Sequence, residues 1–253
     1  MILSSEHHTE PRPLAHVAVH DTVVKILSKL PRGKVLDVPA GEGALAKRLA
    51  AAGFALQCCD LYPEVFSVKD IEVRRGDLSA RLPYEPQEFD YVTCIEGLEH
   101  IENLHQAVRE LRRLLKPNGY LIVSIPNIQN IEERLKWLFF GYTSHFKPIS
   151  SEYLDRIEGD RFNRKEMFLH IHPIGYSELR YTLENNKFRL IGIFRDKRKG
   201  RIWLYWPLAF FICLLVKFFP HQKRSERWTD ELQSNEILLG GNTLIVLAVK
   251  MQE

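Results

Sequence analysis

Strand-like and helix-like segments alternate along this chain, and that alternation restricts the fold more than any other feature. Short runs rich in β-forming residues end in polar residues, and a helical apolar stripe such as Leu104 to Leu115 follows. Strands that alternate with helices predict an α/β fold with a mostly parallel sheet and helices on both faces. The first five expected strands are 34–38, 55–59, 71–74, 89–95 and 120–125.

Polar residues follow these strands where a bound ligand would lie. Ligands of such sheets bind outside the carboxyl ends of the strands. After the first strand the chain reads VPAGEGAL, a tight glycine loop opening into a helix. Such a loop lets a ligand approach the backbone, and the helix N-terminus offers unpaired N–H groups. The polar residues expected at this edge are Asp37, Asp60, Asp77, Glu96 and Asn127.

The position of Asp60 indicates a ligand that carries a ribose. It lies 19 residues beyond Gly41, and a carboxylate at this separation accepts hydrogen bonds from both ribose hydroxyls. Gly41, Gly43 and Ala46 fit the looser form of the dinucleotide pattern, so an NAD(P)-dependent oxidoreductase stays open. Asp37 would repel a pyrophosphate, whereas it suits a positively charged amino-acid group.

Five consecutive segments resemble motifs of the class I S-adenosylmethionine-dependent methyltransferases of the small-molecule type. The glycine loop resembles their first motif, with Pro39 in place of the usual glycine, and Asp60 resembles their ribose-binding acid. The segments 76–78, 83–103 and 111–127 resemble the motifs that follow. The resemblance implies a Rossmann-like seven-stranded sheet whose last strand is antiparallel, with S-adenosylmethionine as cofactor. A non-catalytic methyltransferase-like binding protein is a further alternative.

The resemblance also assigns cofactor-binding residues. The methionine part would contact Asp37, Ala40 and the glycine loop, and the ribose would contact Asp60. Asp77 would accept a hydrogen bond from the adenine amino group. The full expected set is Asp37, Ala40, Gly41, Gly43, Asp60, Leu61, Asp77, Leu78, Ile95 and Glu96. We expect the pocket to bind the cofactor despite Pro39.

Methyl transfer from a sulfonium is a direct displacement in which alignment does much of the catalysis. A base is needed only where the acceptor loses a proton, and His100 is the candidate, with a packing histidine as the alternative. His170 and His172 would point the same way on a strand. We expect no metal there, because no cysteine, aspartate or glutamate is arranged nearby to complete a ligand shell.

The acceptor is expected to be small or lipid-linked. The segment IEGL at 95–98 replaces the (N/D)PPY motif of enzymes that methylate adenine or glutamine amino groups. The net charge is only +3, and no basic stripe with stacking aromatics is present, so we expect no nucleic-acid partner. The long segment 128–176 is expected to form a cap that recognises the acceptor.

An apolar insertion precedes the last expected strand at 242–250. Residues 202–216 carry no charge, and as a helix they would span about 22 Å, less than the roughly 30 Å hydrocarbon core. Basic residues flank this run on both sides, so 201–220 is expected to lie on a membrane surface. A buried helix and a dimer contact are the alternatives.

These features divide the chain and suggest its location. A lead-in with a helix (1–30), a cofactor-binding core (31–127), the cap (128–176) and a C-terminal part of the sheet (177–253) are expected. The N-terminal segment lacks a secretory signal pattern, and the four cysteines show no CxxC spacing. We therefore expect a cytoplasmic protein, peripheral on the cytoplasmic face of a membrane, with buried reduced thiols.

Overall fold

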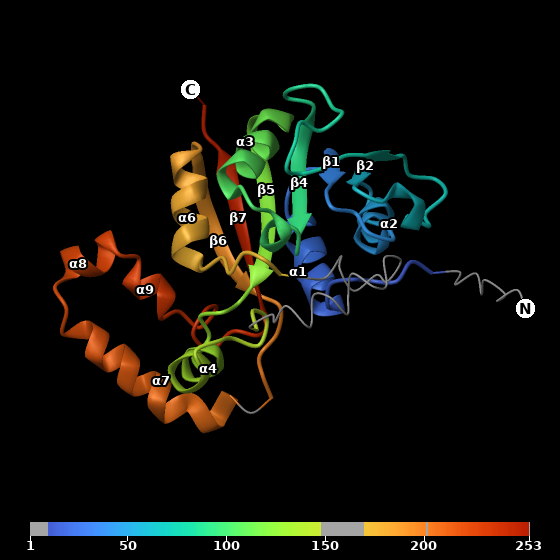
Figure 1. Ribbon diagram of the computed structural model, residues 1–253. Coiled ribbons are helices and arrows are strands. Elements are labelled where there is room, and N and C mark those ends of the chain that lie inside the picture. The colour runs from blue at the N-terminus through green and yellow to red at the C-terminus, as the bar shows by residue number, and fades with distance from the viewer. Residues whose placement is uncertain (1–9, 148–169, 201, 253) are drawn as a thin grey trace, which may run out of the picture.

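A seven-stranded sheet forms the centre of the computed structural model, which describes residues 10–147, 170–200 and 202–252 (Figure 1). The strand order is β3-β2-β1-β4-β5-β7-β6. The strands are β1 Lys34–Asp37, β2 Ala55–Asp60, β3 Val73–Arg75, β4 Phe89–Ile95, β5 Leu115–Pro126, β6 Phe188–Arg195 and β7 Thr243–Lys250. The expected Rossmann-like, mostly parallel sheet is confirmed.

The strand pairing places most of the carboxyl ends at one edge of the sheet. Neighbouring strands from β3 through β5 pair in parallel, whereas β7 is antiparallel to both β5 and β6. The carboxyl ends of every strand except β7 therefore share one edge of the sheet, as expected for a ligand site. β5 begins earlier than the expected 120–125 because Leu115 already pairs with Phe89.

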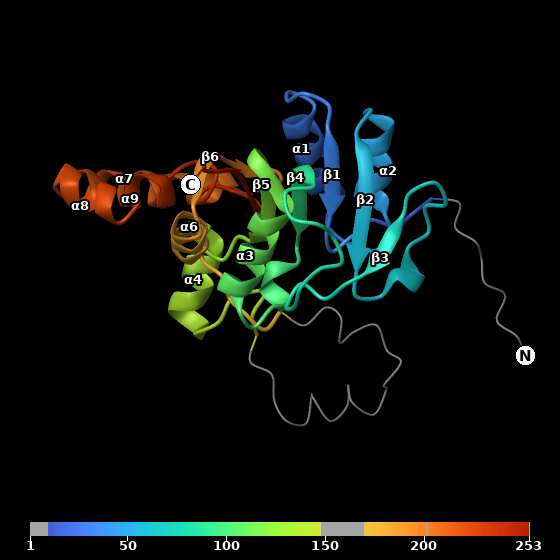
Figure 2. The same ribbon diagram turned by 90° about the horizontal axis from the view of Figure 1, so that it is seen from above.

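Helices cover both faces of the sheet. α1 (Val17–Leu27) and α2 (Ala44–Ala51) pack on one face, and α3 (Leu104–Leu114) and α6 (Tyr176–Asn185) pack on the other (Figure 2). The start of α3 shows why the helix begins at that position. The Asn103 side chain caps it by accepting a hydrogen bond from the Gln106 N–H at 3.0 Å. The apolar stripe expected from its sequence is buried against the sheet.

Two connections at the carboxyl edge carry further helices. α4 (Ile131–Phe140) follows β5 directly, and two short 3₁₀ turns, η1 (Pro63–Val65) and η2 (Leu98–His100), follow β2 and β4. Between β6 and β7 the chain inserts α7 (Ile202–Lys217), α8 (His221–Glu226) and α9 (Thr229–Leu232). Residues 148–169 of the expected cap 128–176 lie outside the described residues. Among the described helices, none is both long and apolar enough to cross a membrane.

Candidate functional site

A cavity of about 550 Å³ opens at the carboxyl edge of the sheet. The loops after β1, β2, β3 and β4 form its walls, together with the N-terminal lead-in and His170. Nine of the ten residues predicted to bind the cofactor line it: Asp37, Ala40, Gly41, Asp60, Leu61, Asp77, Leu78, Ile95 and Glu96. The cavity thus brings together most of the residues that the family resemblance assigned to the cofactor, and their role in binding it stays a prediction.

Asp60 holds the glycine loop in place and lines the cavity. Its Oδ2 accepts a hydrogen bond from the Gly41 N–H at 2.8 Å, and its Oδ1 accepts one from the Tyr62 N–H at 2.9 Å. A carboxylate offers about four acceptor positions, so about two remain for ribose hydroxyls. Gly41 has a φ of 54°, a conformation that glycine adopts without strain.

Gly43 is the predicted site residue that does not line the cavity. It precedes α2 with a φ of 90°, and a Cβ there would lie 2.7 Å from side-chain atoms of both Phe66 and Val68. Backbone conformation and close packing therefore require glycine at this position. Asn127 also turns away, because its Nδ2 donates to the Ile237 carbonyl at 2.9 Å.

Asp37 is a buried carboxyl group at the end of β1. The Thr93 hydroxyl donates a hydrogen bond to its Oδ1 at 2.7 Å. Burial, together with the nearby charge of Asp60, raises the pKa of Asp37 to about 7, against the lowering effect of the hydrogen bond from Thr93. A bound cation would favour the ionised form, which is the property needed beside a positively charged amino-acid group.

Pro39 fits the loop because Gly97 leaves room for it. A Cβ on Gly97 would lie 2.5 Å from Pro39 Cδ, so the proline ring packs directly on the Gly97 backbone. Both residues line the cavity. Gly97 thus accommodates proline in the position that resembled a family glycine.

The two ends of the cavity differ in exposure to solvent. At one end Leu61 and Asp77 are exposed, and Asp77 Oδ1 accepts a hydrogen bond from the Ser79 N–H at 2.8 Å. At the other end the Thr243 hydroxyl donates to Glu96 Oε1 at 2.9 Å, and burial raises the pKa of Glu96. The open end suits an adenine ring, and the enclosed acidic end suits a cation.

Some lining residues could not be identified from sequence. Arg12, Leu14 and His20 reach the cavity from the lead-in and α1, where no motif marks them. The Arg12 N–H donates to Glu42 Oε2 at 2.9 Å, which attaches the lead-in to the glycine loop. Burial lowers the pKa of His20 to about 4, so the His20 side chain is uncharged near pH 7.

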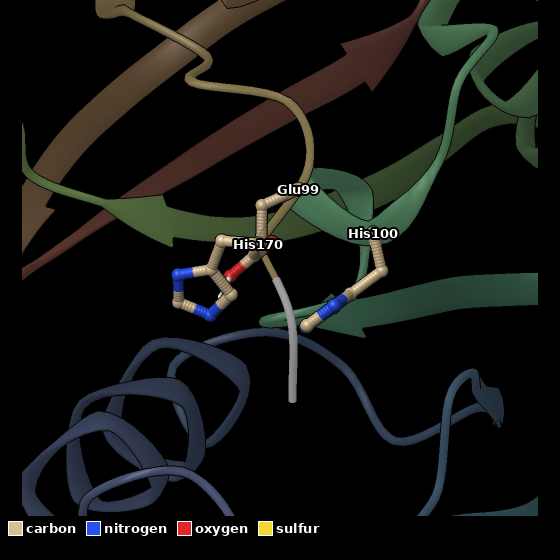
Figure 3. Close-up of side chains that lie close together, drawn as sticks. All are labelled: Glu99, His100 and His170. Atoms are coloured by element: carbon tan, nitrogen blue, oxygen red, sulfur yellow. Dashed lines mark ion pairs between the residues drawn. The ribbon is translucent and has the colours of Figure 1, made fainter. Parts of the chain in front are cut away.

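Glu99, His100 and His170 form a cluster at the cavity (Figure 3). The rings of His100 and His170 are 4.9 Å apart, and both residues line the cavity. His170 Nε2 lies 4.0 Å from Glu99 Oε1. Glu99 is fully buried, and burial raises its pKa to about 8. Its carboxylate oxygens accept no hydrogen bond from the part of the chain that the structure describes.

The position of Glu99 in this cluster corrects the argument from the sequence against a metal. The absence of an acid near His170 was the reason to expect no metal, and that reason was wrong because Glu99 folds beside it. The candidate ligand atoms of the three residues lie within 4.8 Å of one another, a donor set that could hold a divalent cation. His172 is not part of it, since its Nε2 lies 2.9 Å from Glu178 Oε1. A site without metal stays a prediction.

Comparison with known proteins agrees with this geometry. A family model described as a methyltransferase domain matches residues 10–160. A ubiquinone biosynthesis O-methyltransferase from Serratia proteamaculans is 30% identical over 160 residues, 55% of this chain and 66% of the relative. One of the same name from Xanthomonas campestris pv. campestris is 34% identical over 107 residues, 39% of this chain and 45% of the relative. The matched part thus spans about half the length of such relatives.

Solved structures show the same fold at low sequence identity. A protein from Pyrococcus horikoshii superposes with a TM-score of 0.57 at 18% identity, covering 94% of this chain and 92% of that protein. An S-adenosylmethionine-dependent methyltransferase from Methanosarcina mazei superposes with a TM-score of 0.54 at 15% identity, covering 90% and 98% of the two chains.

Proposed function

We propose that this chain, which belongs to the methyltransferase-domain family and is an S-adenosylmethionine-dependent methyltransferase, methylates a small or lipid-linked acceptor by direct displacement. The family membership leaves the NAD(P)-dependent oxidoreductase and the non-catalytic binding protein without support. The observation that carries the proposal is the position of His100 and His170 in the wall of the cavity that also contains Asp37 and Asp60.

The cofactor residues fit S-adenosylmethionine in shape and charge. Asp60 offers acceptor positions to the ribose, and we assign the adenine to Asp77 and Leu78, which line the same cavity. Asp37 and Glu96 provide acidic groups for the positively charged amino-acid end. When bound, the cofactor supplies an electrophilic methyl group with an uncharged thioether as leaving group. The chain's own contribution is alignment of the acceptor with that methyl group.

We assign proton removal from the acceptor to His100. A hydroxyl that gains a methyl group must release its proton, and an imidazole nitrogen accepts it as the new O–C bond forms and the S–C bond breaks. The name O-methyltransferase of the relatives supports an oxygen acceptor in this chain. His170 packs against the His100 ring, and we propose that it positions that ring.

The test replaces His100 with glutamine and measures methyl transfer from labelled S-adenosylmethionine to a phenolic probe, 3,4-dihydroxybenzoate. Loss of a proton acceptor is expected to lower kcat by about 10²- to 10⁴-fold. Affinity for the demethylated cofactor, measured by calorimetry, is expected to stay unchanged. His221→Gln, an exposed histidine on α8, is the matched control.

Two outcomes would contradict the assignment. An unchanged kcat in His100→Gln would show that the acceptor needs no base from this residue. Loss of activity with a chelator, restored by Mg²⁺, would instead assign the Glu99, His100 and His170 cluster to a cation.

We further propose that the reaction takes place at a membrane surface on the cytoplasmic side, without nucleic acid as partner. The uncharged segment 202–216 supports this location, because it is too short to cross a bilayer and is flanked by basic residues. The described part of 128–176, including α4, lies at the edge that holds the cavity, as a recognition cap would.

A further inference from the structure

α7 presents apolar side chains to solvent around most of its circumference. Trp203, Trp206, Phe210 and Phe211 are between 54% and 69% exposed. Among the helix's described side chains, only Ala209 is buried. A helix that is apolar on all sides is normally enclosed by a protein core or by lipid.

A narrow strip attaches α7 to the rest of the protein. Ala209 packs with Ile131 of α4 and with Leu238, which precedes β7. The partly buried residues of this strip are Tyr205, Ile212 and Cys213. Their spacing places them on one side of the helix, so the remaining sides face outward.

The end of α4 extends this exposed apolar area. α4 contacts α7, and the two helices lie together beyond the sheet (Figure 1). Trp137, Leu138, Phe139 and Phe140 are between 61% and 73% exposed. We call these four residues together with α7 the apolar platform.

The charged residues around the platform indicate what kind of partner it binds. Residues 197–227 contain eight lysines and arginines and one acidic residue. The acids at the start of α4 are already paired, since Glu132 contacts Lys199 at 2.6 Å and Glu133 contacts Lys136 at 2.9 Å. Exposed cations beside α7 are Arg198, Lys217, Lys223 and Arg227.

We propose that the apolar platform binds the surface of an anionic phospholipid bilayer. Tryptophan and phenylalanine insert at the level of the headgroups, and lysine and arginine contact anionic lipid. A second copy of this chain would instead bring two cationic rims together. The platform thus takes a lipid surface as its partner, and the membrane-binding region includes the end of α4 as well as α7.

The platform shares an edge of the sheet with the cavity. α4 leaves the carboxyl end of β5, and the insertion with α7 leaves the carboxyl end of β6. The cavity is built from the carboxyl ends of β1, β2 and β4. Bilayer binding therefore brings the catalytic cavity toward molecules embedded in the lipid, and in this respect the inference rests on the proposed function.

The intrinsic tryptophans test this directly. Three of the chain's four tryptophans, Trp137, Trp203 and Trp206, belong to the platform. The full chain is mixed with vesicles of phosphatidylcholine alone or with phosphatidylglycerol, and binding is measured by flotation. We expect flotation with the anionic vesicles, weaker flotation at high salt, and quenching of tryptophan emission by brominated acyl chains.

Matched variants distinguish vesicle binding through the platform from nonspecific hydrophobic binding elsewhere on the surface. Phe210→Ser/Phe211→Ser is expected to lower vesicle binding by about tenfold or more, because two exposed aromatic side chains are lost from the interface. Val17→Ser/Ile191→Ser removes two residues of similar exposure elsewhere, 50% and 48%, and is expected to bind like the original chain.

Three results would overturn the inference. They are no flotation with anionic vesicles, unquenched tryptophan emission, or a dimer in sedimentation that the phenylalanine variant abolishes. Calorimetry with the demethylated cofactor on the same preparations keeps the two proposals distinguishable. Intact cofactor binding without flotation refutes the platform alone, and flotation without cofactor binding refutes the proposed function alone.

Discussion

Replacing Asp60 with alanine tests the cofactor assignment most directly, because one carboxylate carries two roles. It accepts hydrogen bonds from the N–H groups of Gly41 and Tyr62, and it lines the cavity where a ribose would bind. A hydrogen bond to a charged group contributes about 1.5–3 kcal/mol, so two ribose bonds contribute about 3–6 kcal/mol. We expect affinity for the demethylated cofactor to fall by about 10²- to 10⁴-fold.

The same substitution also loosens the glycine loop, and the assay must separate the two effects. Two backbone N–H groups lose their acceptor, which is expected to lower the free energy of unfolding by about 1–3 kcal/mol. Calorimetry is therefore run with S-adenosylhomocysteine and with its 2′,3′-dideoxy analogue. If Asp60 binds the ribose, removing the hydroxyls weakens binding to the original chain and leaves binding to Asp60→Ala unchanged.

Asp70→Ala, at an exposed turn, serves as the control and is expected to bind both compounds like the original chain. The reasoning is refuted if Asp60→Ala discriminates between the two compounds as strongly as the original chain does. It is also refuted if a cooperatively folded Asp60→Ala keeps the original affinity.

Two further predictions follow from the loop around Asp60. Burial raises the pKa of Asp37 from 3.8 to about 7, so S-adenosylmethionine, which favours the ionised form, should bind more tightly as pH rises through 7. Calorimetry at pH 6 to 8 should show that cofactor affinity in Asp37→Asn no longer depends on pH in this way. Equal pH profiles for the variant and the original chain would contradict the prediction. Gly97→Ala places a Cβ against the Pro39 ring and should lower the free energy of unfolding by about 1–3 kcal/mol in denaturant titrations. Gly200→Ala, with open space around it, should be neutral, and equal stability of the two variants would refute the packing argument.

The sequence predicted the sheet and most of the cavity because both depend on local pattern. Asp37, Asp60 and Glu96 each follow a strand, and parallel strands bring such residues to one edge whatever the details of packing. The lead-in residues Arg12 and His20 lie in no motif, so their place in the wall depends on tertiary packing alone.

Contacts between distant segments account for what sequence reasoning missed. Glu99 and His170 are 71 positions apart, and only the folded chain shows that a buried acid lies beside that histidine. Gly43 matches a ligand-binding motif in sequence, but it does not line the cavity, and a Cβ there would lie 2.7 Å from side-chain atoms of Phe66 and Val68. A motif in the sequence therefore does not show whether its glycine is required by a ligand or by the packing of neighbouring side chains.

The connection between β6 and β7 is a point at which proteins with this sheet can differ in length. Its two ends are already neighbours, since the Asp196 N–H donates to the Thr243 carbonyl at 3.3 Å. Closing a loop between fixed neighbours costs only about 0.6 kcal/mol for each doubling of its length. Helices can therefore be gained, lost or exchanged at this point with little entropic penalty to the sheet. The part that we propose to face a membrane can therefore vary while the cavity at the other strands stays the same.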